Sequence, residues 1–107
     1  MTASAEEIAW AAGLFEGEGS ITQSGGHVRL SLTMTDEEPI RRFVKIVRRG
    51  AVHGPYAYER WADGHERKPF WTWVCYDRAE ARVTIEHLAP WLSTRRLARA
   101  HELGIYP

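Results

Sequence analysis

Two glutamates, Glu16 and Glu18, stand among glycines near the start of the chain. Glu18 lies directly between Gly17 and Gly19, so neither neighbour has a side chain that shields its carboxylate. The segment ends a predicted helix, where the helix dipole disfavours an added negative charge. A divalent cation that prefers oxygen ligands would reverse this penalty. Glu18 is therefore a candidate metal ligand.

The glycines themselves form a second pattern. Gly13 and Gly17 are four residues apart, and together with Ala9 they give one helix face very little side chain. Each glycine inside a helix lowers the stability of the helix by about 1 kcal/mol relative to alanine. Two of them on one face suggest a compensating contact, such as the close approach of another backbone. The alternative is that both glycines allow tight packing and both glutamates are solvated helix ends. Spacing alone leaves the two interpretations open.

The first half of the chain predicts a helix, a hairpin and a second helix. Ser4 and Glu7 form a capping box for a helix over residues 4–17, and Thr35 with Glu38 does the same for a helix that runs to Gly50. Between them, residues 20–23 and 27–35 read as two strands joined by a glycine-rich turn. The second strand alternates strictly between polar and apolar residues over nine positions, which is typical of a strand with one buried face.

The second half repeats this order. Residues 51–60 and 70–76 are predicted strands, Asp77 with Glu80 caps a third helix, and Thr94 starts a short last one. The register of the two strands stays open, because Gly54 and Pro55 suggest a bulge and both faces of residues 70–76 are apolar. The order predicts one α+β domain over residues 1–107, αββαββα(α), with a four-stranded antiparallel sheet and helices on one face. The other face must meet solvent or a ligand.

Composition excludes several classes of protein. Cys75 is the only cysteine, and no histidine lies three to five residues from another, which argues against disulfide frameworks and structural zinc sites. No apolar run is long enough for a membrane span, and no signal peptide is recognisable, so we expect a cytoplasmic protein. The 14 basic and 14 acidic residues cancel, which counts against a nucleic-acid binder.

Residues 11–19, Ala-Ala-Gly-Leu-Phe-Glu-Gly-Glu-Gly, followed by Ser20 and Ile21, resemble the signature of the LAGLIDADG homing endonucleases. The segment departs from the namesake mildly, with glutamate at both acidic positions. The hairpin, the helix containing Arg41, and residues 88–92 before a basic last helix also fit the family order. The resemblance implies a saddle-shaped sheet and an enzyme that hydrolyses phosphodiester bonds in double-stranded DNA.

The resemblance also implies roles for individual residues. Glu18, with the backbone carbonyl of Gly17, would bind Mg²⁺ or another divalent cation such as Mn²⁺ at the cleavage centre, while Glu16 would support the helix end. Asp36, Arg41 and Arg78 are the nearest matches to the family's supporting polar and basic residues.

A single motif in the chain implies a homodimer with a palindromic or near-palindromic site. The expected dimer interface consists of Ala9, Ala12, Gly13, Glu16 and Gly17. The residues expected to face the DNA are Ser20, Thr22, Ser24, His27, Arg29, Ser31, Thr33, Tyr58, Arg60 and Thr72. Arg29 is the best candidate for a guanine contact.

Two other functions share this fold, a dimeric DNA-binding regulator that does not cleave and an RNA-splicing maturase. Glu18 at the metal position favours the nuclease. Intron homing and a free-standing gene both fit the sequence. Arg95, Arg96 and Arg99 would contact phosphates or offset the dipole of the last helix. With zero net charge, we expect weak, metal-assisted binding to non-specific DNA.

Overall fold

The computed structural model describes residues 3–57 and 68–107. Helix α1 (Ala5–Glu18) begins at the predicted capping box, in which the Ser4 hydroxyl accepts from the Glu7 amide (3.1 Å) and the Ser4 amide donates to the Glu7 carboxylate (2.9 Å). The helix ends at Glu18, and the Gly19 amide donates to the Phe15 carbonyl. The motif therefore lies on one helix that leads directly into the sheet.

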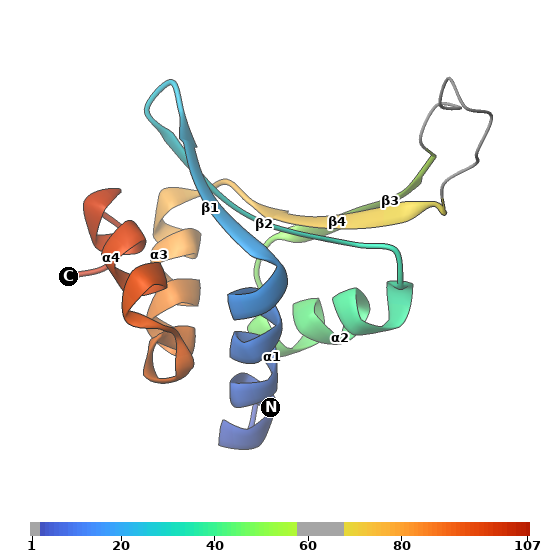
Figure 1. Cartoon of the computed structure of the whole chain (residues 1–107), viewed down its shortest axis with the longest axis horizontal. Helices are drawn as coiled ribbons and strands as arrows, with labels where there is room; N and C mark the ends of the chain where they lie inside the picture. Colours follow the sequence, from blue (N-terminus) through green and yellow to red (C-terminus); the bar gives the residue numbers. More distant parts are fainter. Residues whose placement is uncertain (1–2, 58–67) are drawn as a thin grey trace.

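Four strands form one antiparallel sheet in the order β1-β2-β4-β3 (Figure 1). They are β1 (Gly19–Ser24), β2 (His27–Met34), β3 (Ala51–Tyr56) and β4 (Phe70–Cys75). The β1–β2 turn uses Gly25 (φ +56°) and Gly26 (φ +84°), since this two-residue turn needs positive φ at both positions. The predicted bulge is confirmed by a register shift between His53 and Tyr56. Residues 58–60, the end of the predicted third strand, lie outside the described residues.

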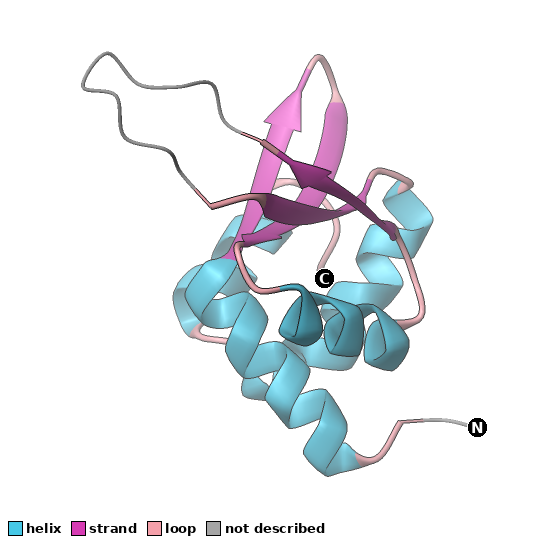
Figure 2. Ribbon diagram, turned by 90° about the vertical axis from the view of Figure 1, so that its right-hand side faces the viewer, coloured by secondary structure: helices cyan, strands magenta, loops and turns pink. Residues whose placement is uncertain are grey.

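The helices cover one face of the sheet and leave the other open (Figures 1 and 2). They are α1, α2 (Glu37–Val47), α3 (Arg78–Leu88) and α4 (Thr94–Glu102), with a short 3₁₀ turn η1 (Ala89–Trp91) where Pro90 ends α3. Asp77 caps α3 as predicted. The predicted Thr35 cap is wrong, because Asp36 accepts from the Glu38 amide and α2 starts one residue later. None of the helices in the described ranges is long and apolar enough for a membrane span.

The core lies between the sheet and the helices. Phe15, Phe43 and Trp73 are fully buried and pack ring against ring, with the Phe43 and Trp73 centroids 4.8 Å apart. The apolar positions of β2, such as Leu30 and Leu32, complete the floor of this core. The C-terminal segment packs back as Ile105, which is also fully buried. The α+β architecture predicted from the sequence is confirmed.

Strand pairing settles the two faces of β4. Leu32 pairs with Trp73 and lies in the core, whereas Thr33 pairs with Thr72 and their hydroxyls are 3.1 Å apart. Alternation then places Trp71, Trp73 and Cys75 toward the helices and Phe70, Thr72 and Val74 on the open face. The sequence could not separate these faces because both are apolar.

Candidate functional site

Glu18 is the last residue of α1 and is exposed. Its carboxylate makes no hydrogen bond or ion pair with any described residue. Gly19, which follows, is buried, and a Cβ there would collide with the Phe15 ring. Only glycine fits at this junction, and it allows α1 to lead directly into β1. The Glu18 carboxylate therefore lies at the helix end, just before the sheet.

The donors at this helix end suit a hard divalent cation. A carboxylate and a backbone carbonyl, here those of Glu18 and Gly17, are the oxygen ligands that Mg²⁺ and Ca²⁺ prefer. No three His, Cys, Asp or Glu side chains in the described residues gather closely enough to hold a metal.

Gly13 and Gly17 are exposed, and a Cβ added at either would meet nothing within 4 Å. Packing within the chain therefore does not explain these glycines, whereas the exposed Glu18 still fits a solvated helix end. Ala9, on the same stripe, is half-buried. The prediction for Ala12 is wrong, because Ala12 is fully buried in the core of its own chain and has no surface to offer a second one.

Glu16 joins α1 to the start of α4. Its carboxylate accepts from the Ser93 amide (2.8 Å) and hydroxyl (2.9 Å), and Arg96 donates to its backbone carbonyl (3.0 Å). The Ser93 amide is the main cause of a lowered Glu16 pKa, with further lowering by the Ser93 hydroxyl, Arg96 and Arg95. These contacts give Glu16 a structural role, which is to hold the end of α1 against the start of α4. A role in the dimer interface stays a prediction for Ala9, Gly13, Glu16 and Gly17.

The predicted DNA-facing residues of β1, β2 and β4 lie in rows across the open face. Thr22 pairs with Arg29, Ser20 with Ser31, and Ser24 with His27. Thr33 pairs with Thr72, which pairs on its other side with His53, a residue that sequence reasoning missed. The alternation of β2 predicted this polar face. The sequence could not place His53 on it, because His53 lies beside the bulge in β3, where the pairing register was left open. Tyr58 and Arg60 lie outside the described residues.

No family model and no curated protein matches the chain. Among solved structures, the homing endonuclease I-CvuI with its target in the presence of calcium has a TM-score of 0.64 and 21% identity over 90% of this chain. The LAGLIDADG meganuclease I-CpaMI bound to uncleaved DNA has a TM-score of 0.62 and 15% identity over the same share. The fold is that of LAGLIDADG homing endonucleases. The chain spans 62% of the length of I-CvuI and 34% of that of I-CpaMI.

Within this LAGLIDADG-type fold, the three expected supporting residues have partners in their own chain. Asp36 caps α2, Arg41 pairs with Glu37 (3.2 Å) on the exposed side of α2, and Arg78 donates to the Leu103 carbonyl (2.8 Å). The Arg78 contact ties the start of α3 to the end of α4. The catalytic roles of Asp36, Arg41 and Arg78 stay predictions.

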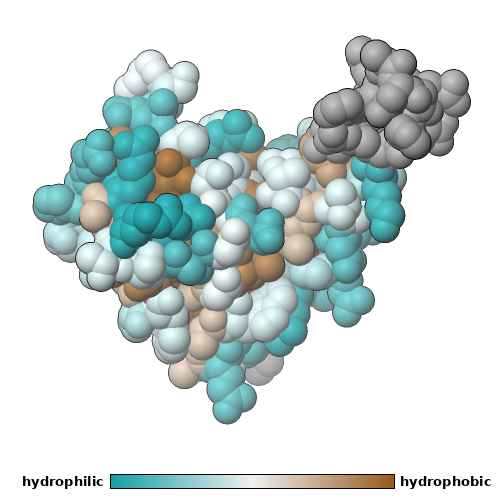
Figure 3. Space-filling model, viewed as in Figure 1, coloured by the Kyte–Doolittle hydropathy of each residue, from teal (hydrophilic) through white to brown (hydrophobic). Residues whose placement is uncertain are grey.

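A basic groove of about 460 Å³ runs between β1 and α4 of the LAGLIDADG-type fold. Ser20, Thr22, Arg95 and Arg99 are among its lining residues. Figure 3 shows hydrophilic side chains gathered on the flank where β1 and α4 lie in Figure 1. Arg96, which also lines the groove, donates to the Glu16 carbonyl, so the groove adjoins the end of α1.

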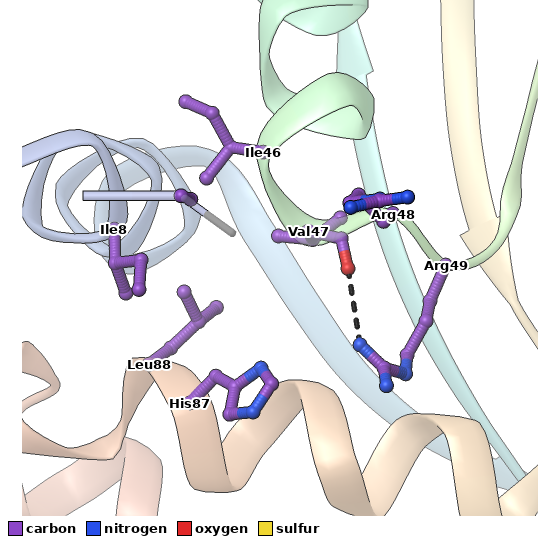
Figure 4. A pocket seen from close by; sticks show the side chains of 8 residues that line it. Ile8, Ile46, Val47, Arg48, Arg49, His87 and Leu88 are labelled. Atoms are coloured by element: carbon purple, nitrogen blue, oxygen red, sulfur yellow. Dashed lines mark hydrogen bonds between the residues drawn. The ribbon is translucent and has the colours of Figure 1, made fainter. Parts of the chain in front are cut away.

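Another pocket, of about 470 Å³, lies between α1, α2 and α3 (Figure 4). Ile8, Ile46 and Leu88 contribute apolar walls, and Arg49 donates to the Val47 carbonyl. Among the described residues that line this pocket, none is a carboxylate and none lies on the open face of the sheet.

Proposed function

We propose that this protein is a metal-dependent, site-specific DNA endonuclease that acts as a homodimer on a palindromic or near-palindromic duplex. The observation that carries the proposal is the exposed carboxylate of Glu18, which has no partner among the described residues, at the end of a glycine-lined helix. The LAGLIDADG-type fold supports the same conclusion, because the solved relatives are homing endonucleases in complexes with DNA.

The homodimer is supported by the open glycine face of α1. In a C2 dimer the same patch of both copies meets itself, so α1 would pack against α1 of the second copy. Two helices approach most closely where glycine leaves no side chain between them, and Gly13 and Gly17 have free space around them in one chain. Such pairing would bring the two helix ends, and with them the two Glu18 carboxylates, toward one axis.

The metal site would consist of Glu18 and the Gly17 carbonyl from each copy. Divalent cations supply an activated water and stabilise the leaving oxygen in phosphodiester hydrolysis. The chain's own part is to hold hard oxygen donors at a fixed helix end. The Gly19 amide ties that end to the Phe15 carbonyl, and Glu16 ties it to Ser93, so the backbone that carries the Glu18 carboxylate is held in place.

The open face of the sheet would lie along the major groove, which admits a two-stranded ribbon. Its rows of serine and threonine hydroxyls both donate and accept, so they read bases with little discrimination. Arg29 is the one arginine or lysine among the described strand residues, and a guanidinium can bind O6 and N7 of guanine at once.

The test uses a plasmid that carries the DNA flanking this gene, joined without the gene. We expect linear product in Mg²⁺ and none in EDTA. Glu18→Gln should bind the same DNA and lose cleavage by about 100-fold or more, because it removes the charged metal ligand. Glu86→Gln, at an exposed position on α3 paired with Arg82, is the matched control and should cleave normally.

The same assay separates the other functions. Binding without a metal-dependent double-strand break would contradict the nuclease and favour a DNA-binding regulator. Tight binding to the host intron RNA with no binding to the duplex would favour a maturase. Cleavage that survives in Glu18→Gln would show that another residue holds the metal.

A further inference from the structure

Tyr76 lies at the edge of the open face and has no evident role in the fold. It follows β4 directly, is 60% exposed and is not part of the hydrophobic core. Among the described residues its ring has one electrostatic partner, the guanidinium of Arg29, whose central carbon lies 5.6 Å from the ring centroid. Because Tyr76 is exposed and lies outside the core, burial does not explain its presence on the open face.

The sheet register accounts for this contact. Leu30 pairs with Cys75, so the preceding residue of β2 lies opposite the residue that follows β4, on the other face. Thr22 pairs with Arg29 from the other side, and its hydroxyl lies 3.5 Å from the Arg29 carbonyl. Thr22 of β1, Arg29 of β2 and Tyr76 just after β4 therefore form one row on the open face.

The contact leaves the hydrogen-bonding groups of Arg29 available. A guanidinium meets an aromatic ring with its flat face, whereas its N–H donors point outward in the plane of the group. The Arg29 side chain makes no hydrogen bond or ion pair with any described residue. Most arginines on the helices differ, since Arg41, Arg82 and Arg99, for example, each pair with a glutamate.

We propose that Tyr76 is a positioning residue that holds Arg29 ready to read one guanine in each half-site. The ring restricts a long, flexible side chain before DNA arrives, so less conformational freedom is lost when the planar fork meets O6 and N7. This inference rests on the proposed function, because it assumes that the open face binds DNA.

The test is selection of binding sites from a randomised DNA duplex in Ca²⁺, followed by sequencing. The wild type should enrich a palindromic site with one guanine per half-site that Arg29→Ala no longer selects, a loss of about 5- to 150-fold in preference. Tyr76→Ala should weaken the preference at that same position by about two- to fivefold, and leave the other positions and the salt dependence unchanged. Tyr76→Phe should keep the preference, because it keeps the ring.

Arg82→Ala on α3 is the control for loss of a distant arginine and should select the wild-type site. Thermal unfolding of each variant checks that the exposed substitution leaves the fold intact. A Tyr76→Ala protein with the wild-type preference at the Arg29 position would overturn the inference alone, as would a Tyr76→Phe protein that behaves like Tyr76→Ala. A wild type that enriches no sequence would overturn the proposed function as well.

Discussion

Glu16 and Glu18 are two residues apart and do different work. Glu16 is held by Ser93 and by Arg96, whereas Glu18 has no partner among the described residues. The family resemblance implied a supporting role for Glu16 but did not identify its partner, which lies 77 residues away along the chain. Glu16 stabilises the end of α1, and Glu18 is exposed to solvent at that end.

Glu16 predicts a pH dependence of stability. Its pKa is lower in the folded chain than in the unfolded one, so its stabilisation is fully present above the unfolded value of about 4.3 and is lost as pH falls through the lower folded value. Glu16→Gln should reduce the free energy of unfolding at pH 7 by about 1 to 2 kcal/mol, allowing for partial exposure. The difference from wild type should shrink as the pH falls below the unfolded value and through the lower folded one.

Urea unfolding of both proteins at several pH values measures this effect. Glu86→Gln, which disrupts an exposed pair with Arg82, should change stability by less than about 0.5 kcal/mol at every pH. A Glu16→Gln protein with the same pH profile as wild type would contradict the structural role.

Cys75 is expected to be chemically inert. It is 2% exposed, and burial, with Glu80 and Asp77 nearby, raises the pKa of its thiol to about 11. Since the thiolate is the reactive form, the native protein should resist iodoacetamide at pH 8 and react fully in urea. Rapid labelling of the native protein, followed by mass spectrometry, would show that β4 opens readily and would contradict the packing described above.

Helix α1 and its junction with β1 contain two kinds of glycine. Gly19 has no room for a side chain within the chain, whereas Gly13 and Gly17 have space around them. The proposed dimer would explain Gly13 and Gly17, because α1 of a second copy would fill the free space around them.

Gly13→Ala should therefore have opposite effects on the chain and on the dimer. Replacing glycine inside a helix raises the stability of one chain by about 0.5 to 1 kcal/mol. The added methyl group should weaken dimerisation by about tenfold or more, because overpacking a close contact is destabilising. Sedimentation velocity over a range of concentrations measures the second effect, and thermal unfolding of dilute protein measures the first.

Gly19→Ala is the comparison on the same motif. It should lower the stability of the fold by about 1 to 3 kcal/mol, since its Cβ would collide with the Phe15 ring. A Gly13→Ala protein that dimerises like wild type would show that the open glycine face serves another purpose.

The elements could be predicted from the sequence where one local pattern decides them. The alternation of β2 gave its buried face, and Ser4 with Glu7 gave the start of α1. Where a distant partner decides the structure, the sequence left it open or predicted it wrongly. The faces of β4 depend on pairing with β2, and Ala12 faces the core because α1 packs against the sheet with Ala11 and Phe15. The side chain that steadies Arg29 depends on register in the same way.

The whole molecule carries no net charge, with 14 basic and 14 acidic residues. Twelve of the basic residues are arginine, the side chain best suited to bidentate contacts with phosphate and guanine. Several are paired with carboxylates on the helices, as Arg41 is with Glu37, so the available positive charge is smaller than the count suggests. Binding to DNA should therefore depend on the metal more than on the protein's own field.

This dependence can be measured by fluorescence anisotropy with a non-specific duplex. At about 150 mM salt we expect weak binding, near the low-affinity end of the usual range of about 10⁻⁴ to 10⁻⁶ M. Mg²⁺ should strengthen binding of the wild type and have little effect on Glu18→Gln. Equal strengthening in both proteins would show that the cation acts elsewhere than at Glu18.

In the proposed homodimer, two copies of Glu18 form one cleavage centre. The direct test mixes wild type with Glu18→Gln at a constant total concentration, allows subunits to exchange, and measures double-strand cleavage in Mg²⁺. If both copies are required, activity follows the square of the wild-type fraction and falls to about one quarter in an equal mixture. A fall to about one half, in proportion to the wild-type fraction, would mean that each chain cleaves alone and would contradict the account.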